Sequence, residues 1–301
     1  MVSEWSIPGS DGAVILGATD LPPAWVEPRG VIFIAHGFKG YKDYGMFPAI
    51  ARACAQARAI AHRFNFSHSG MTNEIATFAR PDLFERDTSN KQVFDLRAVI
   101  EWWNRGGGQV EGRNASSAKL PYFIFGHSRG GVTALLAAGR FADDVSFPQP
   151  AGVITAAAPA SCNPFSRDEA GLLLKLRFLE SPSSRTGQNL RIGRAFLQEQ
   201  LDDPEAHDLP AQIARIRCPI LVIHGENDQT VPAKCAAAIA NAARKAKMVL
   251  IPLADHVFNT PNPMPAEVPA SQQLAGMIGL IIDFMKDRNI GQIYRESSNS
   301  G

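Results

Sequence analysis

Short apolar runs alternate with segments of helical periodicity along most of the chain. The runs are bounded for the most part by Gly or Pro, which is typical of parallel strands buried on both faces. They are GVIFIAHGF (30–38), AIAHRFNF (59–66), YFIF (122–125), AGVITAAAP (151–159), PILVIHG (219–225) and MVLIP (248–252). Helical patterns lie at 46–57, 89–104, 128–141, 233–245 and 271–287. This alternation predicts an α/β fold, in which helices flank a mainly parallel β-sheet.

Turn and capping signals delimit further elements in the first third of the chain. The segment WSIPGSDGAVILGATDLPP predicts two short strands joined by a turn at residues 9–12. At the start of the helix predicted over 89–104, Ser89 and Gln92 have the spacing of a capping box. The polar, glycine-rich stretch 106–119 that follows this helix predicts a surface loop.

The alternation is interrupted between residues 162 and 212. About 50 residues separate two predicted core strands there, whereas such connections usually take roughly 2 to 6 residues. We therefore expect residues 1–161 and 213–301 to form the α/β core, and residues 162–212 to form a small helical lid inserted into it. Basic side chains dominate the first part of this insertion and acidic ones its end. This pattern is typical of solvated helical faces, and substrate selection is the alternative.

The motif G-x-S-x-G lies at residues 126–130, in FIFGHSRGGVTALL. It arises by chance in roughly one chain in ten of this length, so the motif alone is a weak signal. Its position between a predicted strand and a predicted helix strengthens it, because a sharp turn that exposes a serine Oγ leaves room only for small residues two positions away. Ser128 is therefore predicted to be a nucleophile at a helix N-terminus, where amide groups favour negative charge.

A serine hydroxyl becomes a good nucleophile only beside a base, and an acid must orient that base. In turns of this kind the chain order is Ser, then Asp or Glu, then His. The histidines downstream of Ser128 are His207, His224 and His256. His256, in IPLADHVFN, follows a predicted strand end, where the ligand sites of parallel sheets collect. We predict His256 as the base, with a polar loop histidine as the alternative interpretation.

Three carboxylates are candidates for the acid. Glu226 and Asp228 both follow a predicted buried strand in LVIHGENDQTVP. Asp228 is preferred, because it lies just before a predicted helix, on a loop expected at the same sheet edge as Ser128. Glu226 is the alternative. Asp255 is less suitable, because its neighbour His256 would have to turn back along the chain to reach it.

Acyl transfer also needs two fixed N–H donors for the negative oxygen of its transition state. One is predicted to be the backbone N–H of Arg129, the residue after the nucleophile. The other is expected from the loop HGFKG (36–40), and we choose the N–H of Phe38. The side chain of Arg129 is expected either to pair with a nearby acid or to form a positive wall of the pocket.

Composition and charge narrow the class of partner. The 45% hydrophobic and 20% charged residues are ordinary for a globular protein. Lys and Arg number 30 against 29 Asp and Glu, without a long like-charge run, which argues against a nucleic-acid groove or an anionic membrane surface. A small or neutral partner fits better, and no metal or organic cofactor is implied. The four cysteines are widely spaced and are expected to be reduced, mostly buried thiols: Cys54, Cys162, Cys218 and Cys235.

Targeting and membrane signals are weak. MVSEWSIPGSDG lacks the basic and apolar regions of a secretory signal. The apolar stretch LAGMIGLIIDFMK is too short to span a bilayer and predicts a core helix. A cytoplasmic location is therefore expected, and the sequence does not indicate an oligomeric state.

Together these residues resemble the α/β-hydrolase superfamily. The resemblance rests on HGF after an early strand, GHSRG around Ser128, HGENDQTVP with Asp228, and ADH with His256. It implies an α/β-hydrolase fold in which these motifs supply the oxyanion loop, nucleophile, acid and base. FNFSHSG and FERDTSNKQVFDLRAVIEWW are also similar to bacterial hydrolases grouped with dienelactone hydrolases, feruloyl or cinnamoyl esterases and serine aminopeptidase-like enzymes. Dienelactone hydrolases carry a cysteine nucleophile, so serine at position 128 argues against that reaction.

The sequence thus predicts a serine hydrolase that cleaves carboxylic esters or thioesters through an acyl-enzyme on Ser128, with a small-molecule ester or acyl substrate. A peptidase or amidase with the same triad is the alternative. A noncatalytic ligand receptor or scaffold on the same fold is the alternative of another class. Four aromatic residues flank the predicted site loops and are candidates for lining an acyl or aryl pocket: Phe38, Tyr41, Tyr44 and Phe258.

Overall fold

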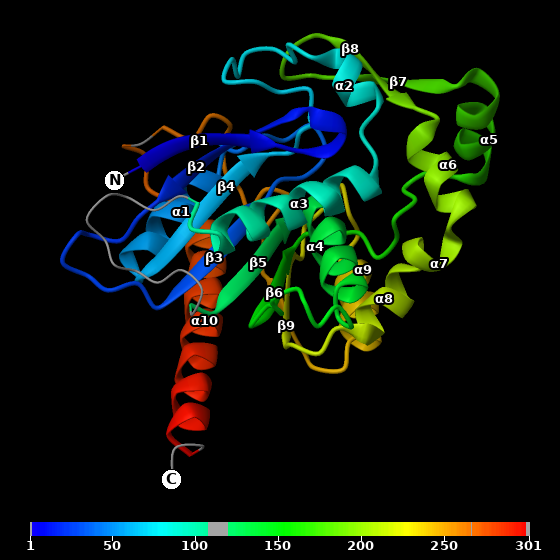
Figure 1. Cartoon of the computed structure of the whole chain (residues 1–301). Helices are drawn as coiled ribbons and strands as arrows, with labels where there is room; N and C mark the ends of the chain where they lie inside the picture. Colours follow the sequence, from blue (N-terminus) through cyan, green and yellow to red (C-terminus); the bar gives the residue numbers. More distant parts are fainter. Residues whose placement is uncertain (1, 108–119, 266, 299–301) are drawn as a thin grey trace.

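The computed structural model describes residues 2–107, 120–265 and 267–298, with side chains up to residue 287. Within these residues, one eight-stranded sheet and one two-stranded hairpin are present (Figure 1). The strands are β1 (Val2–Pro8), β2 (Val14–Asp20), β3 (Gly30–Ala35), β4 (Ala59–Asn65), β5 (Tyr122–His127), β6 (Gly152–Ala156), β7 (Phe178–Pro182), β8 (Asn189–Gly193), β9 (Ile220–Gly225) and β10 (Ala246–Ile251). The order of the large sheet is β1-β2-β4-β3-β5-β6-β9-β10. Every neighbouring pair from β4 to β10 is parallel, which confirms the predicted fold class.

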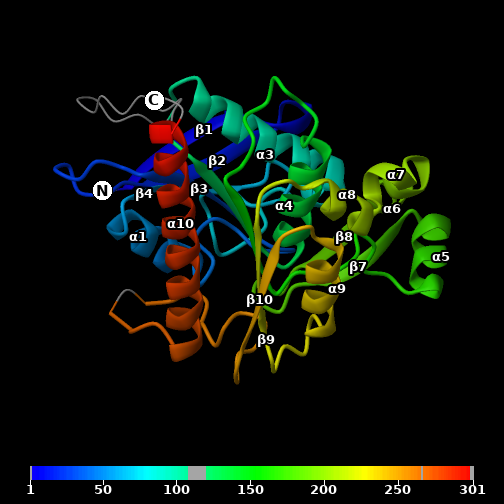
Figure 2. The same cartoon turned by 90° about the horizontal axis from the view of Figure 1, so that it is seen from below.

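Helices cover both faces of the sheet. They are α1 (Phe47–Gln56), α2 (Pro81–Glu85), α3 (Ser89–Asn104), α4 (Arg129–Arg140), α5 (Arg167–Leu176), α6 (Ala195–Asp202), α7 (Pro204–His207), α8 (Leu209–Arg215), α9 (Lys234–Ala242) and α10 (Gln272–Ser298), with a 3-10 turn at Ser10–Gly12. Figure 2 shows α1 and α10 on one side of the sheet, and α3, α4, α8 and α9 on the other. The buried side chains divide in the same way, with Leu96 and Leu135 in one core cluster and Ile50 and Met277 in the other.

The position of a strand in the sheet determines its sequence pattern. All residues of β3 are buried, and GVIFIA is apolar throughout, because helices cover both of its faces. The strand β1 pairs only with β2, antiparallel, and its residues alternate between exposed and half-buried. The strands β3, β5 and β9 run parallel in one sheet, with β6 between β5 and β9. The loops that follow them therefore emerge at the same edge of the sheet.

The segment 162–212 lies beside this edge and is not wholly helical. It contains α5, α6, α7 and the start of α8, which continues past residue 212 to Arg215. It also contains the antiparallel hairpin β7–β8, which the sequence analysis did not anticipate. The sequence does contain a pattern typical of a hairpin, because NLRIG alternates polar and apolar residues and a glycine, Gly187, precedes it. In the structure Gly187 lies in the connecting turn with φ 69°. The hairpin is a structure separate from the large sheet, so it does not interrupt the parallel order.

Several predicted boundaries shift in the structure. The N-cap of α3 is Thr88, whose hydroxyl accepts from Lys91 N–H at 3.3 Å, so the capping box predicted for Ser89 and Gln92 is wrong. The last helix was expected to end near 287, but the backbone of α10 remains helical to Ser298. The surface loop predicted over 106–119 lies outside the described residues from position 108 onward.

Two predictions from composition are answered by the structure. None of the four cysteines forms a disulfide; Cys54 and Cys162 are buried, while Cys218 and Cys235 are half-buried. Among the described residues, no helix has both the length and the apolar character needed to cross a membrane. The cytoplasmic location stays a prediction.

We expect Thr88→Ala to lower the free energy of unfolding by about 1 kcal/mol, because Lys91 N–H loses its side-chain acceptor. Ser89→Ala should change it by no more than about 0.5 kcal/mol, since Ala is the better helix former at the first helical position. Urea unfolding of the two variants and the wild type measures both values. A larger loss in Ser89→Ala than in Thr88→Ala would contradict the assigned N-cap.

Candidate active site

Ser128 lies on the sharp turn between β5 and α4, with φ 55° and ψ −126°. A positive φ costs a residue with a Cβ of order 1–3 kcal/mol and persists only where the surroundings impose it. The backbone N–H of Ser128 donates to Ala156 O at 2.8 Å. A Cβ on Gly126 would lie 2.2 Å from Gly130 O, and a Cβ on Gly130 would lie 2.5 Å from Ala35 O. The requirement for small residues predicted from the motif therefore comes from backbone segments in direct contact.

The three residues predicted as nucleophile, base and acid are brought together. Ser128 Oγ–H donates to His256 Nε2 at 3.1 Å, and His256 Nδ1–H donates to Asp228 Oδ2 at 2.8 Å. Because Nδ1 carries the proton toward the carboxylate, Nε2 is free to accept the serine proton. The carboxylate of Asp228 is fully buried, whereas the side chain of His256 is 18% exposed. The arrangement can deliver a serine oxygen and receive its proton.

Asp228 is held as a carboxylate by its hydrogen bonds. Burial raises its pKa, but hydrogen bonds from His224, His256 and the Val231 N–H outweigh burial and hold the pKa well below its usual value. Oδ1 accepts from the N–H groups of Thr230 and Val231, both at 2.8 Å, and leaves Oδ2 for the imidazoles. A charged acid in this position favours the imidazolium that forms when His256 takes a proton.

Phe38 and Arg129, the residues of the two predicted oxyanion donors, line one cavity together with Ser128. Within the part of the chain that the structure describes, neither Phe38 N–H nor Arg129 N–H has a protein acceptor. A buried imidazole holds the loop that carries Phe38, because His36 Nδ1–H donates to Gly37 O at 2.8 Å. Burial lowers the pKa of His36 to about 4, so this imidazole is neutral. Both backbone amides are therefore available as hydrogen-bond donors, and their role as an oxyanion hole stays a prediction.

The other candidates from the sequence lie elsewhere or have other partners. His207 Nδ1–H donates to Asp203 O at 2.7 Å on α7. Glu226 is exposed, and the Asp255 carboxylate accepts from the N–H groups of the next turn of its own loop. Among the described residues, no group of three or more His, Cys, Asp or Glu is placed to hold a metal ion.

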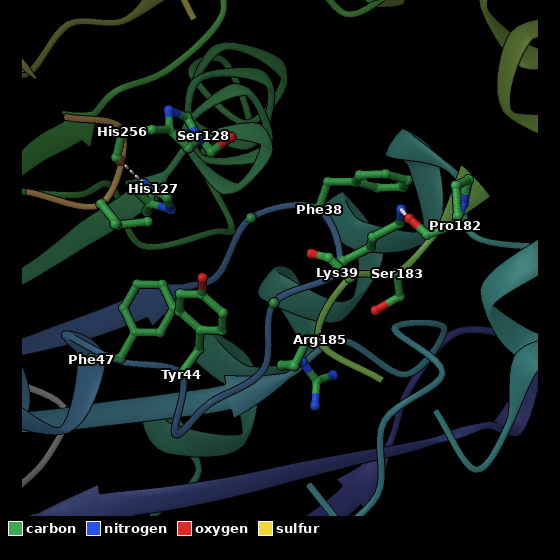
Figure 3. A pocket seen from close by; sticks show the side chains of 14 residues that line it. Phe38, Lys39, Tyr44, Phe47, His127, Ser128, Pro182, Ser183, Arg185 and His256 are labelled. Atoms are coloured by element: carbon green, nitrogen blue, oxygen red, sulfur yellow. Dashed lines mark hydrogen bonds between the residues drawn. The ribbon is translucent and has the colours of Figure 1, made fainter. Parts of the chain in front are cut away.

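Two further histidines support the site: His127, which the sequence analysis did not consider, and His224, which it considered only as a candidate base. His127 is buried, and its Nε2–H donates to His256 O at 2.8 Å (Figure 3). Burial lowers the pKa of His127 to about 3, so it is neutral and fixes the backbone of the base. The Nε2–H of His224 is shared between two acceptors, Val231 O at 2.8 Å and Asp228 Oδ2 at 3.3 Å. Their adjacency to Ser128 and Asp228 in GHS and HGEND was the available signal.

The side chain of Arg129 has the structural partner that the sequence analysis offered as one of two alternatives. Its Nη1 lies 3.0 Å from Asp87 Oδ2, and its guanidinium stacks over the ring of Phe196 on α6 at 4.5 Å. Burial raises the pKa of Asp87 to about 6 despite the neighbouring guanidinium. The contact with Phe196 connects the inserted segment to the turn that carries Ser128.

Two cavities open beside Ser128. The histidine-side cavity, about 200 Å³, borders His256 and is lined by Phe38, Lys39, Tyr44, Phe47, His127, Ser183, Ser184 and Arg185, among others (Figure 3). The arginine-side cavity, about 350 Å³, borders Arg129 and is lined by Phe38, Val132, Cys162, Phe165, Ile192, Phe196 and Val231, among others. Of the aromatic residues proposed for a pocket, Phe38 and Tyr44 line a cavity, whereas Tyr41 and Phe258 are buried beneath the surface.

Comparisons with known proteins agree with this architecture. Residues 31–270 match the model of the alpha/beta hydrolase family. The esterase domain of a Rhodothermus marinus protein is 22% identical, with a TM-score of 0.61, over 94% of this chain and 97% of that one. Est1E from Butyrivibrio proteoclasticus with ferulic acid bound is 16% identical, with a TM-score of 0.66, over 94% and 98%. A dienelactone hydrolase from Anabaena variabilis is 16% identical, with a TM-score of 0.58, over 95% and 98%. No curated protein sequence matches significantly.

We expect Gly130→Ala to lower the free energy of unfolding by about 1–3 kcal/mol, because the new Cβ would meet the carbonyl oxygen of Ala35. Gly279→Ala in α10 is the matched control, since a Cβ there has no neighbour within 4 Å. This control should gain up to about 1 kcal/mol from helix propensity. Urea unfolding measures both, and equal stabilities of the two variants would contradict the close backbone contact.

Proposed function

Because the chain belongs to the alpha/beta hydrolase family, we propose that it is a serine hydrolase that cleaves carboxylic esters or thioesters through an acyl-enzyme on Ser128. The observation that carries the proposal is the hydrogen-bonded chain from Ser128 through His256 to Asp228, on a turn flanked by two unpaired amides. The esterases among structures of the same fold support this class of reaction. The substrate is a small-molecule ester or thioester.

In the first half of the reaction, Ser128 Oγ attacks the ester carbonyl while its proton moves to His256 Nε2. The carbonyl oxygen becomes negative and is held by the N–H groups of Phe38 and Arg129, where losing one such donor typically costs about 3–4 kcal/mol. The bond from the acyl carbon to the leaving oxygen or sulfur then breaks. That atom takes the proton from His256, and the acyl group remains on Ser128.

In the second half, water replaces the departed alcohol or thiol. His256 Nε2 accepts one proton of the water as its oxygen attacks the acyl carbon. The bond between that carbon and Ser128 Oγ then breaks, and Oγ takes the proton back from His256. The products are a carboxylic acid and the alcohol or thiol, and one water molecule is consumed. Asp228 stays ionised throughout and stabilises the imidazolium in both halves.

We assign the hydrolase core to residues 1–161 and 213–301, and a cap to residues 162–212. The supporting observation is that Phe165, Ile192 and Phe196 of this segment line the arginine-side cavity, while Ser183 and Arg185 line the histidine-side cavity. A segment that supplies walls to both cavities controls which substrates reach Ser128.

A fluorophosphonate probe tests the nucleophile without a choice of substrate. We expect the wild-type protein to gain one probe adduct by intact mass, on the peptide that contains Ser128, and Ser128→Ala to gain none. A folded wild-type protein that takes up no probe would contradict the proposal and favour a noncatalytic receptor. A labelled protein that cleaves short peptides in preference to esters would favour a peptidase. The ester screen includes hydroxycinnamate esters, because Est1E binds ferulic acid.

Replacement of the acid distinguishes the two carboxylates in the loop after β9. We expect Asp228→Asn to lower kcat by roughly 10⁴-fold, because the amide holds His256 in the wrong tautomer. Glu226→Gln is the matched control and should keep a kcat close to the wild-type value, since this side chain is exposed. Steady-state hydrolysis of 4-nitrophenyl butyrate gives both values. The reverse order of effects would assign the acid to Glu226.

A further inference from the structure

The two cavities at Ser128 have almost entirely different walls. Phe38 and Ser128 border both, but His256 borders only the histidine-side cavity and Arg129 only the arginine-side cavity. A substrate bonded to Ser128 Oγ therefore has two separate directions in which to extend. The segment 162–212 supplies part of the wall of each cavity.

The proton on His256 determines which direction the leaving group takes. The leaving oxygen must come within hydrogen-bond reach of His256 Nε2, roughly 2.6–3.2 Å, to accept that proton. The negative oxygen points between the amides of Phe38 and Arg129. The acyl group is the remaining substituent of the reacting carbon, so it extends away from His256, into the arginine-side cavity.

The walls of the arginine-side cavity are apolar. Val132, Phe165, Ile192 and Phe196 contribute aliphatic and aromatic surface, and burial raises the pKa of the Cys162 thiol to about 12, so it is neutral. With about 350 Å³, the cavity lies within the range of small-molecule sites.

The charges in that wall are balanced within the protein. Arg129 Nη1 pairs with Asp87, and the guanidinium, whose Nε and Nη2 have no hydrogen-bond partner among the described residues, stacks over Phe196. The Glu169 carboxylate accepts from the N–H and hydroxyl groups of Ser166 at 2.9 and 2.8 Å. An apolar group of medium size therefore matches the cavity better than a charged one.

The histidine-side cavity is smaller and more polar. Ser183, Ser184 and Arg185 come from the turn between β7 and β8, and the side chain of Lys39 reaches Pro182 at the start of this turn (Figure 3). Lys39 Nζ–H donates to Pro182 O at 2.7 Å. Among the described residues, neither Lys39 nor Arg185 has a carboxylate partner. The guanidinium of Arg185 donates to Ile75 O and stacks over Tyr41 and Phe78, so the donors left for a leaving group are the hydroxyls of Ser183 and Ser184 and the remaining ammonium protons of Lys39. Hydroxyl, carbonyl or anionic oxygens on the leaving group would bind to these donors.

On the basis of the proposed function, we propose that the substrate is an ester of an apolar, medium-sized acyl group with a small, oxygen-bearing alcohol. The acyl group occupies the arginine-side cavity, and the alcohol occupies the histidine-side cavity. Ile192 and Phe165 then determine acyl selectivity, whereas Ser184 determines alcohol selectivity.

Three tryptophan variants in the segment 162–212 test this assignment. Ile192→Trp narrows the arginine-side cavity, and Ser184→Trp narrows the histidine-side cavity. Leu172→Trp is the matched control, because Leu172 is 48% exposed on α5 and borders neither cavity. The acyl ratio is kcat/KM for 4-nitrophenyl octanoate divided by that for 4-nitrophenyl acetate. The alcohol ratio is kcat/KM for benzyl butyrate divided by that for methyl butyrate.

We expect Ile192→Trp to lower the acyl ratio by about tenfold or more, since even one methylene in an apolar pocket discriminates 10- to 200-fold. Ser184→Trp should lower the alcohol ratio and leave the acyl ratio at its wild-type value, and Leu172→Trp should leave both. Phe165→Ala, which enlarges the arginine-side cavity, should raise the acyl ratio and remains informative if Ile192→Trp misfolds. Wild-type protein should hydrolyse glyceryl monobutyrate with a higher kcat/KM than butyl butyrate.

The outcomes separate the two proposals. The cavity assignment would be overturned if Ile192→Trp lowered only the alcohol ratio and Ser184→Trp only the acyl ratio. It would also be overturned if both ratios stayed unchanged in every variant while the enzyme was still labelled by the probe. In either case the proposed hydrolase function would remain. A preference for butyl butyrate over glyceryl monobutyrate would overturn the oxygen-bearing alcohol. Absence of both probe labelling and ester hydrolysis in the folded wild type would instead remove the proposed function itself.

Discussion

The contact of three backbone segments around Ser128 is the constraint on which the rest of the structure depends. The end of β5, the start of α4 and the end of β3 approach so closely that neither Gly126 nor Gly130 has space for a Cβ. This packing holds Ser128 at φ 55° and aligns its hydroxyl with His256. The parallel sheet brings these ends together, and the helices on its two faces keep them in register.

Electrostatics around the site rest on the ionised carboxylate of Asp228 and on two neutral imidazoles, His36 and His127. Asp228 keeps its charge because hydrogen bonds compensate for burial. Burial lowers the pKa of both His36 and His127, so these rings bind backbone carbonyl groups without adding positive charge. The positive charge that develops on His256 is therefore matched by Asp228 alone among the groups that touch its ring nitrogens.

Much of the fold could be predicted because buried parallel strands and amphipathic helices leave strong periodic patterns. The candidate residues around Ser128 could also be predicted, because G-x-S-x-G and its neighbouring strand impose local requirements that the sequence displays. Contacts between distant segments left no such trace. The stacking of Arg129 on Phe196 and the support of His256 by His127 arise only when separate loops meet. The N-cap of α3 was missed by one residue, because adjacent Thr88 and Ser89 both have suitable hydroxyl groups.

The hydrogen bond between Ser128 and His256 joins residues 128 positions apart in the chain. Closing so long a loop costs entropy that the local turn around Ser128 cannot repay, so the contact forms only once the intervening strands β6, β9 and β10 have joined the sheet. An unfinished or partly unfolded chain therefore carries the serine motif without its proton acceptor. In a growing chain, the proton acceptor of Ser128 is therefore placed beside it only when the last strand of the sheet has joined.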